Sequence, residues 1–457
     1  MKTDSLVSRR QIASALAGVG LFSVLGAGDR RAEARADTET ATSTPSRPSQ
    51  RPTVSIAGGR RVVDQPAYDD GIAPTDSPDY EPAETRVAAA AWLEAVATEE
   101  VATAIHDELQ TLASSHPNES PLRPVLAAVS DDEQLDGPVS LTIKQSESGA
   151  PTLLVDCPTG VDVEALNSLS AAEFTDRVVS AAQSELSTDK LTETIGGELS
   201  DEAVSAWIEQ AYADLDVRFR QRPEEYDETG VRGLARPAAD TRYRSEGIAM
   251  GSAVRSETRG ATASAGFRGL RAGHAVLVTT AHTFYDREET PYSTDDLVGT
   301  TLYQAHQPHS IGRCQALEHG GRDVADAAAV AVDTHTYPSR YLADDAASGY
   351  GKTPIVGTAS WELLETYQAE GRPIYKQGAV TGRAEGRIDE LRQFSNGYRE
   401  LGVDIYSDGG DSGGPYVVES DEGWLLAGMH KGVVASTGLR IGIFIGSITE
   451  ALDIEVY

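Results

Sequence analysis

Residues 405–415 read Ile-Tyr-Ser-Asp-Gly-Gly-Asp-Ser-Gly-Gly-Pro and carry the strongest functional signal in the chain. A serine hydroxyl becomes a nucleophile only when a base accepts its proton and nearby donors stabilise the oxyanion that it creates on a carbonyl. Gly410 allows its own N–H and that of Ser412 to point at one oxygen. Gly413 and Gly414 leave the hydroxyl accessible. Each of these residue types alone is typical of an ordinary turn, but this order of residues indicates a nucleophile.

The nucleophile needs a base and an acid that orients the base. Among nine histidines, His282 stands at the end of a β-rich run, where a strand meets a loop. Asp326 precedes the small apolar run 327–332, which predicts a carboxylate at the start of a buried strand and partly out of water. Asp323 and Asp333 flank this position and are the competing choices. The sequence therefore predicts a triad of Ser412, His282 and an aspartate, with Asp326 preferred.

In these motifs the chain resembles the chymotrypsin-like serine proteases, in particular the bacterial branch of streptogrisins and α-lytic protease. The order His282, Asp326, Ser412 is the order of that family and differs from that of subtilisins and α/β-hydrolases. Further segments that resemble the family are Thr279-Thr280-Ala281-His282, Asp326-Ala327-Ala328-Ala329-Val330, Lys376-Gln377-Gly378-Ala379-Val380-Thr381-Gly382 and Ile448-Thr449-Glu450-Ala451-Leu452. Thr283 replaces the cysteine that follows the histidine in the family. The resemblance covers residues 246–457, less than half of the chain.

The resemblance implies an all-β double β-barrel for residues 246–457 and a small α+β domain before it. It also implies a serine endopeptidase that hydrolyses peptide bonds through an acyl-enzyme, with the amides of Gly410 and Ser412 as the oxyanion hole. No metal or organic cofactor takes part in such chemistry. The expected partners are protein or peptide substrates, and the expected state is a monomer. A second interpretation is a catalytically silent relative that binds a partner through its cleft or its N-terminal domain.

The resemblance also suggests residues that contact the substrate. Tyr406 is expected at the base of the primary specificity pocket, where it cannot pair with a basic side chain as an aspartate would. Lys431, Gly432 and Val433 are expected to line the substrate strand. His430, together with Lys431, resembles a segment of glutamate-specific relatives, which suggests a preference for an acidic or polar residue before the cut. The alternative for His430 is a histidine packed within a strand.

The composition is strongly acidic, with 71 acidic against 39 basic residues and a net charge of −32. Only six of the basic residues are lysines. Such a surface is expected of a protein that stays soluble in concentrated salt, where charge repulsion is screened. The simpler alternative is an acidic protein without salt adaptation. Nucleic acid is excluded as an expected partner, because a phosphate backbone needs a basic face.

The first residues predict export. Arg9 and Arg10 precede a weakly apolar Ala/Gly-rich run, and Ala34-Arg35-Ala36 offers a small-residue cleavage site. Residues 1–36 are therefore expected to be a twin-arginine signal peptide and the mature protein to be secreted. No later run is long enough to span a bilayer. Residues 37–85, rich in Ser, Thr, Pro and acid, are expected to be a disordered linker.

Residues 86–225 combine helical and strand patterns and are expected to form the α+β domain. Apolar residues recur every three or four positions from 87 to 112 and again from 201 to 215, which predicts two helices. Alternation in 139–143 and 152–155 predicts a pair of strands. By position, this domain is interpreted as a pro-region that assists folding and blocks the cleft, with 226–245 as linker and processing site. An accessory domain that stays attached is the alternative.

Two cysteines and a loose group of histidines complete the candidate sites. Cys157 and Cys314 are compatible with one disulfide or with two isolated thiols. The spacing of His306, His309 and His319 around Cys314 matches no standard zinc pattern. These histidines are therefore interpreted as loop residues, and the sequence predicts no metal site.

Overall fold

The structure is a computed structural model of the 457-residue chain. It describes residues 52–64, 78–115, 140–145, 150–157, 163, 171–186, 188, 191, 200–221, 226–227, 248–259, 261–285, 293–305, 309–319, 323–333, 336, 338–344, 353–434 and 437–457. The expected signal peptide at 1–36, the first part of the expected linker and nearly all of the expected processing site at 226–245 lie outside this set.

Six antiparallel strands near the C-terminus form a closed barrel. They are β17 (Pro373–Gly378), β18 (Gly382–Phe394), β19 (Arg399–Asp404), β22 (Arg440–Phe444), β21 (Gly423–Val434) and β20 (Pro415–Ser420). Each pairs with the next in this order, and β20 pairs with β17 to close the ring. Fully buried side chains such as Ile374, Leu401, Val417 and Leu425 form its core. One of the two expected barrels is therefore present.

A second sheet carries eight strands in an open order. Its strands, in spatial order, are β23 (Glu455–Val456), β10 (Arg268–Arg271), β11 (His274–Thr279), β14 (Ala327–Val332), β13 (Ser310–Glu318), β12 (Thr301–Gln304), β8 (Ala253–Ser256) and β9 (Ala263–Ser264). Small and branched apolar residues, including Leu277, Leu302, Ile311 and Val330, pack inside it. The elements around the two sheets are β7 (Ile248–Met250), η2 (Ala281–Thr283), α8 (Thr294–Leu297), β15 (Pro338–Leu342), β16 (Ile355–Ala359), α10 (Trp361–Glu370) and α11 (Ile445–Leu452).

Part of the stretch expected to be a disordered linker forms strands, so that expectation is wrong for these residues. β1 (Thr53–Asp64) and β2 (Asp79–Ala88) pair antiparallel, and β1 also pairs with β16 of the C-terminal half. The physical reason is the alternation of apolar residues: Val54, Ile56 and Val87 are all buried. Because residues 37–85 are polar on average, their composition does not reveal this short alternation of apolar residues.

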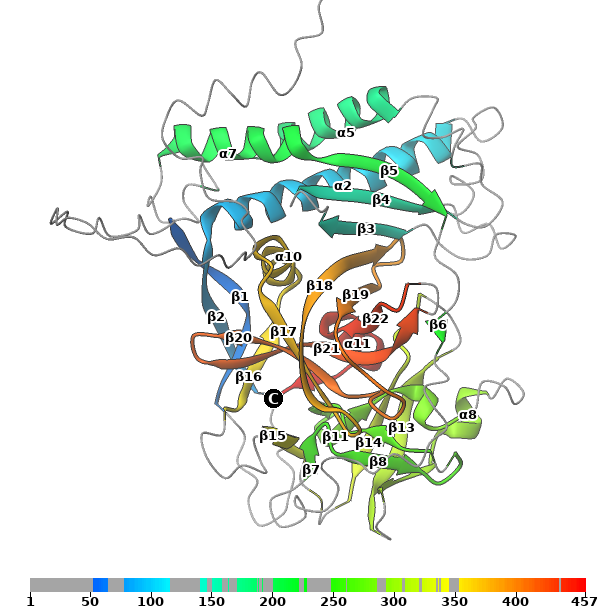
Figure 1. The fold of residues 1–457 in the computed structure, drawn as a ribbon. Helices are drawn as coiled ribbons and strands as arrows, with labels where there is room; N and C mark the ends of the chain where they lie inside the picture. Colours follow the sequence, from blue (N-terminus) through cyan, green and yellow to red (C-terminus); the bar gives the residue numbers. More distant parts are fainter. Residues whose placement is uncertain are drawn as a thin grey trace, which may run out of the picture. The chain divides into compact units, whose positions relative to one another are not determined.

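Residues 89–221 form the expected mixture of helices and strands. The elements are α2 (Ala89–Ser115), β3 (Ser140–Gln145), β4 (Pro151–Cys157), α5 (Ala171–Glu185), α7 (Asp201–Asp214) and β5 (Asp216–Gln221). Figure 1 shows the three helices grouped beside these strands. The strands do not form a sheet of their own, because β3 pairs with β18 and extends the barrel sheet in the order β18-β3-β4-β5. The expected boundary between separate domains is thus crossed by one continuous sheet, within one compact unit over 51–457.

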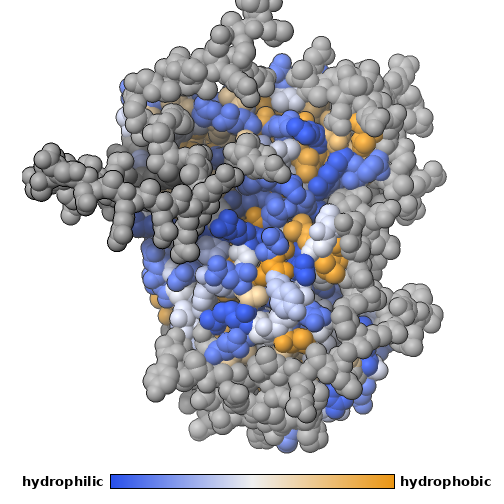
Figure 2. All heavy atoms as spheres, in the orientation of Figure 1, coloured by the Kyte–Doolittle hydropathy of each residue, from blue (hydrophilic) through white to orange (hydrophobic). Residues whose placement is uncertain are grey.

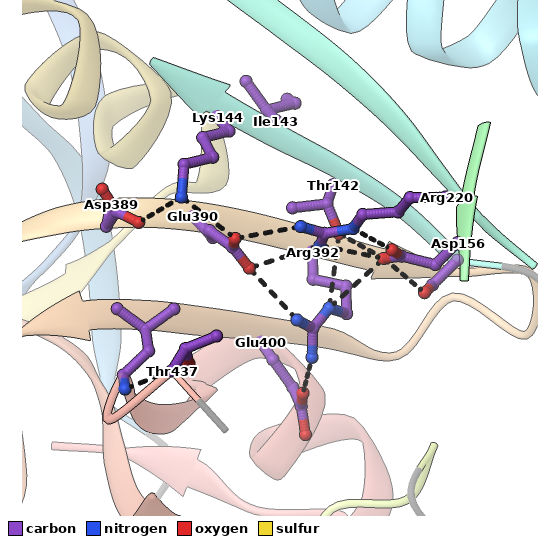
Figure 3. A network of polar contacts seen from close by, with 12 residues as sticks. Thr142, Ile143, Lys144, Asp156, Arg220, Asp389, Glu390, Arg392, Glu400 and Thr437 are labelled. Carbon is purple, nitrogen blue, oxygen red and sulfur yellow. Dashed lines mark hydrogen bonds and ion pairs between the residues drawn. The ribbon is translucent and has the colours of Figure 1, made fainter. Parts of the chain in front are cut away.

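Buried charges join this extension to the barrel (Figure 3). Asp156 of β4 is fully buried and pairs with Arg220 of β5. Arg220 also contacts Glu390 of β18 at 3.2 Å, and Arg392 contacts both Glu390 at 3.2 Å and Glu400 at 3.3 Å. Burial alone would raise the pKa of Glu390, but the neighbouring guanidinium groups lower it. The pair of Arg220 and Glu390 crosses the junction and links the charges of the extension to those of the barrel.

The face drawn in Figure 2 is mostly hydrophilic over the described residues, with hydrophobic residues in small separate patches. Among these residues, no helix has the length and apolar character needed to cross a bilayer.

Candidate active site

His282 and Asp326 meet where two neighbouring strands end. β11 leads into the short helix η2, which contains His282, and Asp326 immediately precedes β14. β11 and β14 pair with Thr279 opposite Ala328, which brings the two ends together. Asp326 Oδ2 lies 2.6 Å from His282 Nδ1, and Asp326 Oδ1 accepts the His282 backbone N–H at 3.0 Å. Both side chains are at most 5% exposed. The carboxylate thus fixes the imidazole by two contacts.

The two competing aspartates form hydrogen bonds with residues other than His282. Asp323 accepts a hydrogen bond from the Asn396 side chain at 3.1 Å, and Asp333 accepts one from Ser310 Oγ at 2.6 Å. Of the three candidates, the structure therefore brings Asp326 to the imidazole.

The turn that carries Ser412 lies against the strand that leads to His282. The Ser412 carbonyl accepts the Ser264 N–H at 2.7 Å. The Ser264 carbonyl in turn accepts the Thr279 hydroxyl at 2.8 Å, three residues before His282. On its other side, Gly413 N–H donates to the carbonyl of His430 at 2.8 Å. Ser412 itself is partly exposed. The structure therefore places the predicted nucleophile in the same region as the predicted base.

Two backbone donors of the serine turn, at Gly410 and Ser412, have no acceptor within the described part of the chain. Among the residues that the structure describes, neither the N–H of Gly410 nor that of Ser412 donates a hydrogen bond. Gly410 has φ of 101°, a backbone region that favours glycine. Its carbonyl accepts Ser264 Oγ at 2.9 Å, which fixes the orientation of the turn. Since backbone donors are nearly always paired inside proteins, two unpaired amides of one turn, separated by a single residue, are suited to hold an oxyanion.

Asp411 anchors this turn from inside the barrel. Its carboxylate forms an ion pair with Lys376, and both side chains are fully inaccessible. It also accepts the backbone N–H of Val380 at 2.9 Å, of Thr381 at 3.1 Å and of Asp408 at 3.1 Å. These contacts fix the residue between Gly410 and Ser412. Both residues lie in motifs that are visible in the sequence, but their pairing is not predictable from it, since no local pattern joins positions 35 residues apart.

The buried pair shifts the pKa values of both groups. Burial alone would raise the pKa of Asp411, but the charge and hydrogen bond of Lys376 outweigh burial and lower it. Burial also lowers the pKa of Lys376, although Asp411 opposes this effect. A carboxylate whose folded pKa is lowered contributes stability above its ordinary value of about 3.9. That contribution is lost as the pH falls through the lowered folded pKa.

Replacing Lys376 with methionine should destabilise the protein by about 3–5 kcal/mol, because it leaves the Asp411 carboxylate buried and unpaired. Urea unfolding followed by tryptophan fluorescence measures this loss as a lower midpoint. The double variant Lys376→Met/Asp411→Asn should regain part of the stability, because it removes the orphan charge as well. A single variant that unfolds at the wild-type midpoint would contradict the anchoring role.

The residues expected to bind substrate occupy different environments. Tyr406 is 66% exposed, and its expected place at the base of the primary specificity pocket stays a prediction. Lys431 is buried, with its ammonium 3.2 Å from Glu400. Gly432 and Val433 lie on β21, and their role in binding the substrate stays a prediction. At Val433 and Val434, the edge of β21 pairs with β6 (Tyr226–Asp227).

His430 is buried inside the barrel and contacts Tyr416. Its Nδ1 lies 3.0 Å from the Tyr416 hydroxyl. Burial, together with the positive charge of Lys376, lowers the pKa of His430 to about 3. Its imidazole is therefore neutral at ordinary pH, and any contact with a substrate would use a neutral N–H donor.

The remaining candidates form no site among the described residues. Cys157 and Cys314 are both buried thiols, and burial raises the pKa of the Cys314 thiol to about 12. Within the described ranges, no group of three or more His, Cys, Asp or Glu residues is arranged to hold a metal ion. His306 and His335 lie outside these ranges.

Comparison with known proteins gives matches among solved structures. No family model and no curated protein matches this chain. Thermobifida fusca protease A matches with 18% identity over 46% of this chain and 97% of that one, with a TM-score of 0.33. A glutamic acid-specific serine protease has the same identity, coverage of this chain and TM-score, over 100% of its own chain. Cellulomonas bogoriensis chymotrypsin matches with 18% identity over 46% and 98%, with a TM-score of 0.32. These neighbours are bacterial chymotrypsin-like proteases, the group that the sequence motifs resemble, and they match about half of this chain.

Proposed function

We propose that this chain is an exported, salt-adapted serine endopeptidase that is made with an N-terminal pro-region. The observation that carries the proposal is the buried imidazole–carboxylate pair of His282 and Asp326, at 2.6 Å, beside a serine turn with two free amides. A silent relative needs none of these features, and nothing in the described residues favours that alternative. The export signal and salt adaptation are proposed from the sequence alone.

The proposed reaction is acyl transfer in two steps. Ser412 Oγ attacks the carbonyl carbon of a peptide bond while His282 Nε2 accepts the hydroxyl proton. Asp326 holds the Nδ1–H tautomer and stabilises the imidazolium that forms. The amides of Gly410 and Ser412 donate to the oxyanion. His282 then protonates the leaving amine, and a water molecule repeats the sequence to release the acid and restore Ser412.

The proposal of a pro-region rests on two backbone pairings. β3 pairs with β18 of the barrel, so residues 140–145 extend the barrel sheet. β6, which follows this region, pairs antiparallel with β21, with Asp227 opposite Val433. Val433 is part of the strand expected to bind substrate, so a strand already seated there would exclude a substrate chain. Cleavage after β6, within 228–245, would allow this strand to leave.

Casein hydrolysis in several molar KCl tests the proposed activity. The secreted, processed protein should hydrolyse casein, and a fluorophosphonate should block the reaction by forming a covalent adduct on Ser412. Peptide mapping by mass spectrometry locates the adduct. The His282→Ala variant is the control, because its serine lacks a base and should react much more slowly. A folded, processed protein that neither hydrolyses casein nor carries the adduct would favour the silent, partner-binding alternative.

A further inference from the structure

The short helix η2, which carries His282, binds only its first carbonyls through its own backbone. The N–H of Thr283 donates to the Thr280 carbonyl at 3.2 Å, and the N–H of Phe284 donates to the Ala281 carbonyl at 2.9 Å. The carbonyls of residues 282, 283 and 284 come next, at the end of the helix, where carbonyls need donors from outside it. The groups that supply these donors therefore fix the segment from which the imidazole extends.

Arg259 binds the backbone of His282 itself. Its Nη1 donates to the His282 carbonyl at 2.7 Å. Asp326 Oδ1 accepts the N–H of the same residue at 3.0 Å. A guanidinium and a carboxylate thus bind the two polar backbone groups of His282, and hydrogen bonds to charged groups are stronger than those between neutral groups. The Cα that bears the imidazole is held between these two contacts.

Two hydroxyls of the same turn bind the next two carbonyls. Ser256 Oγ donates to the Thr283 carbonyl at 2.6 Å, and Thr258 Oγ1 donates to the Phe284 carbonyl at 2.6 Å. Ser256 is fully buried, whereas Thr258 is exposed. Together with Arg259, the turn 256–259 therefore binds three consecutive carbonyls of the segment that carries the predicted base.

This turn is fixed to the eight-stranded sheet. Ser256 is the last residue of β8 and pairs with Leu302 of β12. The N–H of Glu257 donates to the Thr301 carbonyl at 2.9 Å, and Ser256 Oγ accepts the N–H of Arg259 at 3.2 Å. Because these contacts join the turn to a sheet rather than to another loop, it can serve as a rigid support for η2.

We propose that the turn 256–259 positions the base of the triad: its donors hold the imidazole of His282 in the orientation that proton transfer with Ser412 requires. This assignment rests on the proposed endopeptidase function. The turn acts through the backbone of His282 and needs no contact with the substrate, so its loss should lower kcat and leave KM nearly unchanged. A misplacement of about 1 Å at a reacting group can cost about 100-fold in rate.

The first test compares Arg259→Met with Arg271→Met on a fluorogenic peptide. Arg259→Met keeps a long side chain without N–H donors, and kcat should fall by about 10- to 100-fold with KM within about twofold. The rate of fluorophosphonate labelling of Ser412 should fall by a similar factor, because that reaction uses the same base. Both variants are produced as the full chain and allowed to process, and the final extent of labelling gives the concentration of active sites.

Arg271→Met is the matched control. Arg271 is half-buried in the same sheet, and its Nε donates to the Leu452 carbonyl at 2.9 Å. The substitution therefore removes the same kind of bond, from an arginine to a backbone carbonyl, without touching η2. It should keep kcat within about twofold of the wild type.

A second pair of variants separates the donor from the fold. Thr258→Val removes the hydroxyl at nearly constant size, and kcat should fall by about three- to tenfold. Thr258→Ser retains the hydroxyl and should keep the wild-type kcat. Thermal unfolding followed by circular dichroism should give similar midpoints for both variants, because the side chain is exposed.

Three results would overturn the assignment. Wild-type kcat in both Arg259→Met and Thr258→Val would overturn it and leave the endopeptidase function standing. Equal losses in Arg259→Met and Arg271→Met, or in Thr258→Val and Thr258→Ser, would replace it with a general effect on the sheet. Absence of both cleavage and labelling in the folded wild type would overturn the proposed function together with the assignment.

Discussion

Replacing Ser412 with alanine should lower the rate of peptide hydrolysis by about 10⁶-fold, because no other group in the turn forms the acyl-enzyme. The free amides of Gly410 and the substituted residue remain, so a slow reaction over water should persist. The fold should be unchanged, since Ser412 Oγ has no hydrogen bond among the described residues. Initial rates on casein and on a fluorogenic peptide measure the loss, and circular dichroism checks the fold.

The same variant tests processing. If the protein cuts itself within 228–245, the Ser412→Ala chain should accumulate with residues 86–225 still attached, and added wild-type enzyme should convert it. Ser420→Ala is the matched control, because it removes a serine hydroxyl of the same barrel whose partners among the described residues are local, the Gly423 carbonyl and the Glu422 N–H. Retained hydrolysis in Ser412→Ala would contradict the proposed nucleophile. Normal processing in that variant would assign the cut to another protease.

Replacing Asp326 with asparagine should lower kcat by about 10⁴-fold. The asparagine amide can donate to His282 Nδ1, which would hold the imidazole in the tautomer that cannot accept the Ser412 proton. Steady-state kinetics on a peptide at pH 8 measure the effect as a loss in kcat with a small change in KM. Stability should fall less than activity, because the asparagine oxygen still accepts the His282 backbone N–H that Asp326 Oδ1 binds at 3.0 Å.

The two neighbouring aspartates are matched controls for this substitution. Asp323→Asn and Asp333→Asn should keep kcat within about twofold, because those carboxylates bind Asn396 and Ser310 rather than His282. A loss of about 10⁴-fold in either control, with an active Asp326→Asn, would show that the acid of the triad was misassigned.

Features that depend on residues close together in the chain could be predicted from the sequence. The helix predicted from periodicity between 87 and 112 forms as α2 (Ala89–Ser115), and the predicted strand pair forms as β3 and β4. Sequence order also identified Ser412 and His282 as candidates, and the structure places them at turns and strand ends in one region. Hydrophobic periodicity, turn residues and motif order are properties of the sequence itself, so they can be recognised without the fold.

Features that depend on partners from distant segments became visible in the folded structure. In the fold, Asp326 rather than Asp323 or Asp333 contacts His282. The side chain of Tyr406 is exposed, and Lys376 forms an ion pair with Asp411. The fold also continues the barrel sheet through β3, so that the expected domain boundary disappears. The reason is physical: the burial of a side chain and the pairing of a charge are set by strands that are far apart in sequence and meet only in the folded chain.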